Sequence, residues 1–244
     1  MELAGKVALV TGGARRMGRA FAEALAGEGM RLAIHYGASQ DDAVATRDAI
    51  RAGGGVAEIF AADLRDAEAA KALPAAVAAT FGQLDLLVNS AAVMEKLSVV
   101  DTSVEQWDAI LDLNLRAPFF LAQQAAPHLR KTHGKIINIA DLAGLDPWPN
   151  YAAHSISKAG VVMLTRVLAA AFAPEITVNA IAPGAVLVPD DFDQKQKDFL
   201  VSTTPLKRLG TPDDAVQALL YLVKHADFVT GDVLVVDGGR TLRR

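Results

Sequence analysis

The chain of 244 residues contains no cysteine, which excludes a disulfide framework and a metal site built from thiolates. A strong excess of charge of either sign is also missing, since the formal net charge is −4 and the sequence pI is about 5.7. Nucleic acids and anionic membranes are bound by concentrated basic surface, so we expect neither as a partner. The expected partners are a small-molecule substrate and further copies of the chain.

Features that would divide or target the chain are absent as well. No internal repeat or low-complexity linker occurs, and the first residues lead into the apolar run Val7–Val10 without a charged leader or a signal-length apolar core. With 52% hydrophobic residues the chain can bury a substantial core. We therefore expect a single domain over residues 1–244, located in the cytoplasm. No metal site is expected, because no metal-ligand spacing occurs among His35, His128, His133 and His225.

Short apolar runs alternate with alanine-rich stretches along the chain. This alternation is typical of βαβ units, in which a parallel sheet is buried on both faces. The apolar runs lie at Val7–Val10, Leu32–Ile34, Leu84–Val88, Ile136–Ile139 and Val233–Val236. Helices are predicted over Ala43–Ala52, Asp66–Phe81, Val104–Lys131 and Ser155–Phe172.

The segment from Pro183 to Pro205 fits neither the strand period nor the helix period. It begins with Pro-Gly and carries aspartate, lysine and glutamine in its middle. Because it follows a strand predicted to end near Ile181, it is positioned to act as a mobile lid over a site.

A glycine-rich turn follows the first predicted strand directly. It reads Thr11-Gly12-Gly13-Ala14-Arg15-Arg16-Met17-Gly18, and a helix is predicted to begin near Arg19. Glycines at such a turn let the backbone approach a pyrophosphate, and the helix start supplies N–H groups and a favourable dipole. The alternative is a tight connection without a ligand. The position inside a βαβ unit favours dinucleotide binding.

From the first strand to Asp237-Gly238-Gly239 the sequence resembles the short-chain dehydrogenase/reductase family, and Thr11-Gly12-x-x-x-Arg16-x-Gly18 resembles its pteridine reductase branch. The resemblance implies a single-domain Rossmann fold with a doubly wound parallel sheet of about seven strands. It also implies an NAD(P)-dependent oxidoreductase. Arg16, which replaces the usual middle glycine, can reach both the pyrophosphate and the substrate. The alternative is that it points to solvent.

The end of the second strand favours NADPH over NADH. Ile34-His35-Tyr36-Gly37-Ala38-Ser39 contains no acid that would repel a 2′-phosphate, and Arg15 and Ser39 can bond one. Pteridine reductases share the His-Tyr pair and the Ser, although their Arg before that Ser is Ala38 here. Asn89 has two alternatives, a residue that stabilises the sheet or one adjacent to the cofactor. The cofactor residues implied are Gly12, Arg15, Arg16, Met17, Tyr36, Ser39, Asp63, Leu64, Asn89, Lys158, Pro183, Gly184 and Val186.

Four residues fall where the family keeps its catalytic Asn, Ser, Tyr and Lys: Asn114, Asp141, His154 and Lys158. The resemblance implies that Asn114 holds a water, that Asp141 relays a proton or bonds the substrate, and that Lys158 bonds the nicotinamide ribose. His154 stands four residues before Lys158, in the place of the family's tyrosine acid. The alternatives are an ordinary helical asparagine for Asn114 and a cap or loop acid for Asp141.

Spacing places His154 and Lys158 on one helix face. The positive charge of Lys158 disfavours the charged imidazolium, whereas an ionised Asp141 nearby favours it, and the sequence leaves this balance open. Three hypotheses follow: a working reductase whose acid is His154, a weakly active or purely NADP(H)-binding homologue, and a structural or regulatory protein without nucleotide affinity. Tyr151 is a weaker candidate for the acid, since it lies seven residues before Lys158.

Arg16, Met94 and Trp148 are the candidate substrate contacts. Met94 falls where pteridine reductases place a stacking aromatic, and a thioether defines the position of a ring less sharply. Trp148 is either a second stacking face or a surface residue. The C-terminal part, from Pro205 to Gly239, resembles the closing elements of the family, which usually form a two-fold interface. The resemblance therefore implies a homotetramer, with a dimer as the alternative.

Overall fold

A computed structural model describes residues 1–188 and 192–242 of the chain. Seven parallel strands form one sheet in the order β3-β2-β1-β4-β5-β6-β7. This arrangement confirms the expected α/β Rossmann fold with a doubly wound parallel sheet. The strands are β1 (Val7–Val10), β2 (Arg31–Tyr36), β3 (Val56–Ala61), β4 (Leu86–Asn89), β5 (Lys135–Ile139), β6 (Thr177–Pro183) and β7 (Val233–Val236).

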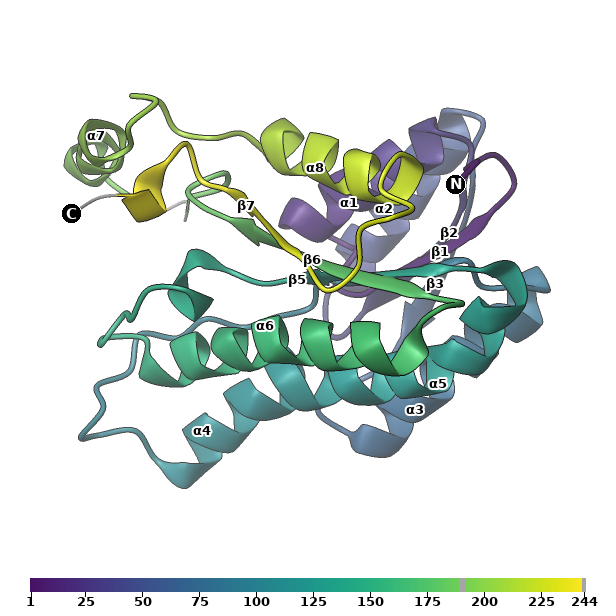
Figure 1. Cartoon of the computed structure of the whole chain (residues 1–244), viewed down its shortest axis with the longest axis horizontal. Coiled ribbons are helices and arrows are strands. Elements are labelled where there is room, and N and C mark those ends of the chain that lie inside the picture. The colour runs from purple at the N-terminus through teal and green to yellow at the C-terminus, as the bar shows by residue number, and fades with distance from the viewer. Residues whose placement is uncertain (189–191, 243–244) are drawn as a thin grey trace.

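Helices cover both faces of the sheet, because parallel strands need crossover connections (Figure 1). One face carries α1 (Arg16–Gly27), α2 (Gln40–Ala52) and α8 (Pro212–Lys224). The opposite face carries α3 (Ala67–Phe81), α4 (Val104–Leu111), α5 (Ala117–Thr132) and α6 (Ala152–Phe172).

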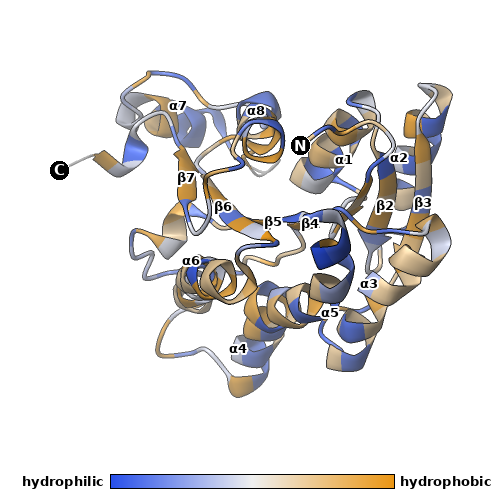
Figure 2. Cartoon of the chain, turned by 45° about the vertical axis from the view of Figure 1, so that its right-hand side comes forward, coloured by the Kyte–Doolittle hydropathy of each residue, from blue (hydrophilic) through white to orange (hydrophobic). Residues whose placement is uncertain are grey.

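The strands are apolar because helices exclude water from both sheet faces. All four residues of β1 and of β4 are buried, and Figure 2 shows apolar residues concentrated on strands such as β2, β6 and β7. Side chains on alternate faces enter two separate cores. Val10 and Val88 pack towards α1 and α8, whereas Leu9 and Leu87 pack towards α3 and α5.

The helical stretch predicted over Val104–Lys131 is observed, but a π turn divides it. The chain forms α4, then one π turn (Asp112–Arg116), then α5. A π turn inserts an extra residue into the helical ladder and changes which side chains face inward. Periodicity over a long window does not reveal this insertion. The helix predicted near Arg19 begins three residues earlier, at Arg16.

The segment Pro183–Pro205 contains a helix that the sequence analysis missed. Helix α7 (Gln194–Thr203) begins with a capping box between Asp193 and Gln196. None of its residues is buried, so it lacks the apolar stripe that marks a packed helix. Residues 189–191 of the predicted lid lie outside the described residues.

Helix α6 has 21 residues and is long and apolar enough, by length and composition alone, to cross a membrane. In this fold it instead lies against β6 and the short 3-10 helix Leu142–Gly144, and its inner face is buried. The buried face includes His154 and Lys158.

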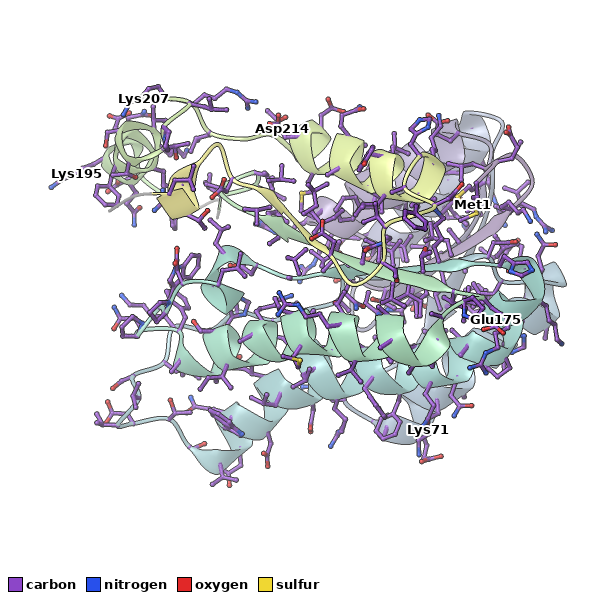
Figure 3. The ribbon with its side chains drawn as sticks, viewed as in Figure 1. Met1, Lys71, Glu175, Lys195, Lys207 and Asp214 are labelled. Carbon is purple, nitrogen blue, oxygen red and sulfur yellow. The ribbon has the colours of Figure 1, made fainter. Side chains whose placement is uncertain are left out.

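The carboxyl ends of the strands point to the end of the molecule where Lys195 and Lys207 project, opposite Met1 and Glu175 (Figure 3). Parallel α/β sheets bind their ligands at this end. The glycine turn after β1 and the amino end of α6 both lie there.

Candidate active site

The turn after β1 is closed so tightly that only glycine fits at two of its positions. A Cβ on Gly18 would lie 2.1 Å from the Gly12 carbonyl oxygen, and a Cβ on Gly12 would lie 3.0 Å from the Cα of Ala91. Gly12 also has a φ of +63°, a conformation that favours glycine. The turn therefore leaves bare backbone at the start of α1, where the first N–H groups have no intrahelical acceptor. This cradle fits a pyrophosphate.

A second turn, after β4, is tied to the first through Thr11. The Thr11 hydroxyl oxygen accepts hydrogen bonds from the N–H groups of Ser90 (2.9 Å) and Ala91 (3.1 Å), and it donates to the Val88 carbonyl. Thr11 therefore connects the two turns at the carboxyl end of the sheet.

Arg15, Arg16 and Met17 occupy the start of α1. Arg15 and Arg16 are exposed, whereas Met17 packs partly against the core. Arg16 has a φ of +52°, and its Nη2 donates to the carbonyl of Leu187 at 3.4 Å. Its side chain thus reaches from the glycine turn to the segment after β6.

The predicted adenosine-side residues lie at the ends of β2 and β3. Tyr36 is buried, and Ser39 precedes α2 without capping it through its hydroxyl. Asp63 is exposed and paired with Arg65 at 2.8 Å, and the hydrogen bonds from Arg65 hold the pKa of that carboxyl below its usual range. Leu64 is buried in the core beneath α3 and α5.

His154 lies on the buried face of α6, with only 3% of its surface exposed. Its Nδ1 is 3.2 Å from the carbonyl oxygen of Val93, which can only accept, so Nδ1 carries a proton in this arrangement. Its Nε2 is buried and has no hydrogen-bond partner among the described residues. Its hydrogen-bonding capacity is therefore unused among the described residues.

Asp141 is the acidic group nearest to that nitrogen. Its Oδ2 lies 3.7 Å from Nε2 of His154, while its Oδ1 accepts the N–H of Ala143 and caps the short 3-10 helix. The alternative reading of Asp141 as a cap is therefore correct, and the structure also brings it to His154. One carboxylate oxygen of Asp141 thus caps the short helix while the other faces the His154 ring.

Lys158 is buried below His154 on the same helix, and its Nζ donates to the Ile139 carbonyl at 2.7 Å. Burial lowers the pKa of Lys158 to about 8, and the negative charge of Asp141 opposes part of this shift. Asp141 therefore acts electrostatically on Lys158 and also lies beside the His154 ring.

Asn114 lies in the π turn, which directs its side chain towards α6. The side chain bonds both backbone groups of Val93 at 2.9 Å, and its Nδ2 donates to Ser157 Oγ and lies 3.5 Å from Nδ1 of His154. Asn114 thus holds the same Val93 carbonyl that fixes the His154 ring. Ser157, which also donates to the His154 carbonyl, was missed, although its spacing on the helix face of His154 was the available signal.

Asn89 joins the sheet to α6 through a buried polar chain. Its Nδ2 donates to Asn138, which donates to Thr165. Asn89 thus links the strands, as in one of its two alternatives, but its Oδ1 has no hydrogen-bond partner among the described residues. Contact with a cofactor stays a prediction.

The remaining predicted residues lie around this centre. Pro183 ends β6, and Gly184 has no room for a Cβ, which would lie 2.9 Å from Asp237 Cα. Val186 is buried, in a cavity of about 460 Å³ that extends towards β7 and α8.

Two of the three predicted substrate residues, Met94 and Trp148, lie on separate loops. Met94 is 44% exposed directly after Val93. Trp148 packs edge-on against Tyr151, with ring centroids 6.2 Å apart, and Tyr151 precedes the first residue of α6. Trp148 is thereby held near the helix that carries His154. The described residues hold no group of three or more metal-binding side chains.

His35 was named only in the His-Tyr pair and among histidines without metal-ligand spacing, but it contacts the glycine turn. Its Nδ1 lies 3.1 Å from the Gly12 nitrogen. A histidine within the apolar run of β2 was the signal that marked it.

Comparison with known proteins identifies the family. Residues 12–241 match the family model described as enoyl-(acyl carrier protein) reductase. The chain is 36% identical to 3beta-hydroxysteroid dehydrogenase 1 of Eggerthella lenta, over 99% of this chain and 95% of that protein. It is 35% identical to the 3-oxoacyl-[acyl-carrier-protein] reductase of Staphylococcus aureus, over 96% and 97%.

Two further proteins are similar over almost the whole chain. Glucose 1-dehydrogenase 2 of Bacillus subtilis is 33% identical over 99% of this chain and 96% of its own. A crystal structure of a provisionally assigned short-chain alcohol dehydrogenase from Sinorhizobium meliloti superposes with a TM-score of 0.94 and 32% identity, covering 100% of this chain and 99% of the other.

Proposed function

Since the chain belongs to the short-chain dehydrogenase/reductase family, whose members are NAD(P)-dependent oxidoreductases, we propose that it is an NADPH-dependent reductase in which His154 replaces the usual tyrosine acid. The substrate is a small molecule with a carbonyl or imine group. The observation that carries this proposal is the buried Nε2 of His154, which has no hydrogen-bond partner within residues 1–188 and 192–242 and lies 3.7 Å from Asp141.

A bound nicotinamide supplies the hydride. His154 holds a proton at Nε2 and donates it to the substrate oxygen or nitrogen on which negative charge develops. The carboxylate of Asp141 faces Nε2 at 3.7 Å, and the Val93 carbonyl fixes the ring through Nδ1. Because His154 and Lys158 are almost completely buried, water is largely excluded from the proton-transfer step.

NADPH is favoured by the charges beside β2. The end of this strand carries no acid, and Arg15 is exposed on the adjacent turn. The hydroxyl of Ser39 is not used to cap α2, so it can bond a 2′-phosphate. Asp63, the acid among the predicted cofactor residues, is paired with Arg65.

The substrate class follows from Arg16, Met94 and Trp148. An exposed guanidinium and a partly exposed thioether suit a flat, electron-rich ring, such as a pterin, a quinone or a cyclic ketone. The names of the relatives cover a hydroxysteroid, an oxoacyl group and glucose, so relationship alone does not select among carbonyl compounds.

The alternative is a homologue that binds NADP(H) but has lost most of its activity. It is favoured by the same Nε2 atom, because 3.7 Å is too long for a hydrogen bond and the substrate must approach an atom that is closed to solvent. This alternative keeps the cofactor site. A purely structural or regulatory protein would bind no nucleotide.

Oxidation of NADPH by the wild type, His154→Ala and His154→Tyr tests these functions. Rates are measured between about pH 5.5 and 8 with dihydropterins, quinones and diketones, and His154→Ala is expected to lower kcat by about 10²–10⁴-fold. His225→Ala, at an exposed histidine, is the matched control. A silent wild type that His154→Tyr revives would instead establish the impaired homologue. NADPH binding without turnover in all variants would leave only a binding function.

A further inference from the structure

His35 is a buried histidine at the end of β2, between two loops at the carboxyl edge of the sheet. Only 3% of its surface is exposed. Its Nδ1 accepts the N–H of Gly12 at 3.1 Å, and its Nε2 lies 3.1 Å from the carbonyl oxygen of Ala62, just after β3. Its own carbonyl accepts the N–H of Gly13 at 3.0 Å. One residue therefore joins the glycine turn to a neighbouring strand end.

These partners determine where the imidazole carries its proton. The Gly12 N–H can only donate, so Nδ1 must be unprotonated, and the Ala62 carbonyl can only accept, so Nε2 must carry the proton. The ring is thus neutral and in a single tautomer. Burial lowers the pKa of His35 below its usual value of 6.5, and Asp63 and the bond to Ala62 oppose this shift in part.

The same contact assigns different roles to the amides of the turn. The Gly12 N–H points into the protein, at the His35 ring, and is not available to a phosphate. A pyrophosphate must therefore be held by the amides at the start of α1, which lack intrahelical acceptors. The contact between the Gly12 N–H and the His35 ring holds the turn, and the shape of the turn sets the direction of those amides.

Charged side chains near His35 come from two of the segments around it. Asp63 and Arg65 follow β3 and are paired with one another, while Arg15 and Arg16 start α1 and are exposed. Of these four side chains, Asp63 acts electrostatically on the imidazole ring. Tyr36 is the titratable neighbour within β2.

We propose that His35 is a positioning residue of the cofactor site, whose neutral imidazole holds the Gly12 N–H and so keeps the glycine turn in the shape that binds the phosphates. The proposal rests on NAD(P) binding at this turn. When the ring is protonated, its Nδ1–H and the Gly12 N–H become two donors facing each other, and the turn must move. Cofactor affinity then falls as the pH falls.

Two isosteric variants separate the two contacts of the ring. In His35→Asn the side-chain oxygen takes the place of Nδ1 and still accepts the Gly12 N–H. In His35→Gln the side-chain amide takes the place of Nε2 and bonds only Ala62. His35→Leu removes both contacts, and His225→Asn, at an exposed histidine, is the matched control.

The dissociation constants of NADPH and NADH are measured by calorimetry between about pH 5 and 8, with thermal unfolding recorded for each variant. At pH 8, His35→Gln and His35→Leu are expected to weaken binding about 10-fold, because the buried Gly12 N–H loses its acceptor. His35→Asn binds within about 3-fold of the wild type. In acid the wild type loses more affinity than His35→Asn, whose amide does not titrate. This comparison also cancels the titration of the cofactor's own 2′-phosphate.

Equal binding by His35→Gln and His35→Asn, or parallel pH profiles of wild type and His35→Asn, would overturn the proposal. If His35→Leu does not fold, the comparison of Asn with Gln still decides. A wild type that binds neither cofactor at any pH would overturn the cofactor site itself. Normal binding in all variants would overturn only the role of His35.

Discussion

His35 and His154 are both 3% exposed, but different partners face their ring nitrogens. His35 lies between an N–H donor and a carbonyl, which fixes a neutral ring. His154 lies between the Val93 carbonyl and the Asp141 carboxylate. The same residue type therefore serves as a fixed contact in one place and as the proposed acid in the other.

The titration of Lys158 is expected to limit the activity at high pH. Its pKa of about 8 means that it loses its charge as the pH rises through this value, so we expect kcat/KM for NADPH to fall above about pH 8. The fall is absent in Lys158→Arg, whose guanidinium stays charged, even if its overall rate is lower. Initial rates from pH 7 to 10 measure this. An unchanged alkaline limit in Lys158→Arg would assign it to another group.

The titration of Lys158 should also change the stability of the protein, which is expected to rise over the pH range in which the activity falls. The pKa of Lys158 is lower in the folded protein, at about 8, than its value of 10.5 without burial, so the unfolded chain binds more protons between these values. The free energy of unfolding contributed by Lys158 therefore rises over this range. Lys158→Gln removes the rise, as urea unfolding at pH 7.5 and 10 would show.

Arg16 is held in a conformation that only glycine adopts without cost. With a φ of +52°, Arg16→Gly should raise the free energy of unfolding by about 1 kcal/mol. We also expect weaker binding of cofactor or substrate, because the guanidinium is lost. Arg19→Gly, in the regular part of α1, is the control and should lower stability by about 1 kcal/mol. Equal losses in both variants, measured by urea unfolding, would contradict a strained Arg16.

At the scale of elements, the glycine turn and the π turn place the site. The glycine turn brings α1 back onto the end of β1, and the π turn between α4 and α5 directs Asn114 at Val93 and His154. Each of these two turns is a local departure from regular secondary structure.

Gly18→Ala tests the closure of the glycine turn. Its Cβ would meet the Gly12 carbonyl oxygen at 2.1 Å, so the turn must open, with a loss of about 1–3 kcal/mol of stability and weaker NADPH binding. Gly27→Ala, at the other end of α1, is the matched control, because its Cβ would meet nothing within 4 Å. Thermal unfolding and NADPH titration compare them. Equal affinities would show that the turn tolerates the methyl group.

At the scale of the whole molecule, large apolar side chains remain exposed on two faces. Monomeric proteins rarely expose extended apolar patches, so we propose the homotetramer expected from the family resemblance, with each face meeting a further copy. On the α4–α6 face these residues are Val104, Trp107, Phe119, Ile156, Met163 and Val167, and on the C-terminal side they are Tyr221, Phe228 and Val235.

Light scattering after size exclusion should give four times the chain mass of 25.7 kDa. Tyr221→Glu and Trp107→Glu should each reduce this mass to that of a dimer, because each places a charge in one of the two interfaces. Lys195→Glu, on α7, is the control and should leave the tetramer intact. A wild-type protein of one chain mass would exclude the assembly.

The sequence by itself determined the parallel α/β fold, the glycine turn and the placement of His154 and Lys158 on one helix face. Each depends on residues near one another in the chain: the alternation of apolar runs, the glycines of Thr11–Gly18, and a spacing of four on a helix. Local sequence suffices, because backbone sterics and periodic burial act over a few residues.

Only the tertiary structure decided which groups of the site contact one another. Asp141 and Val93 lie beside the His154 ring, although they precede His154 by thirteen and sixty-one residues in the chain. The His35 ring lies between Gly12 and Ala62. The lowered pKa of Lys158 likewise arises from burial by distant segments. Hydrogen-bond direction and desolvation depend on which groups meet in space, and local spacing does not record this.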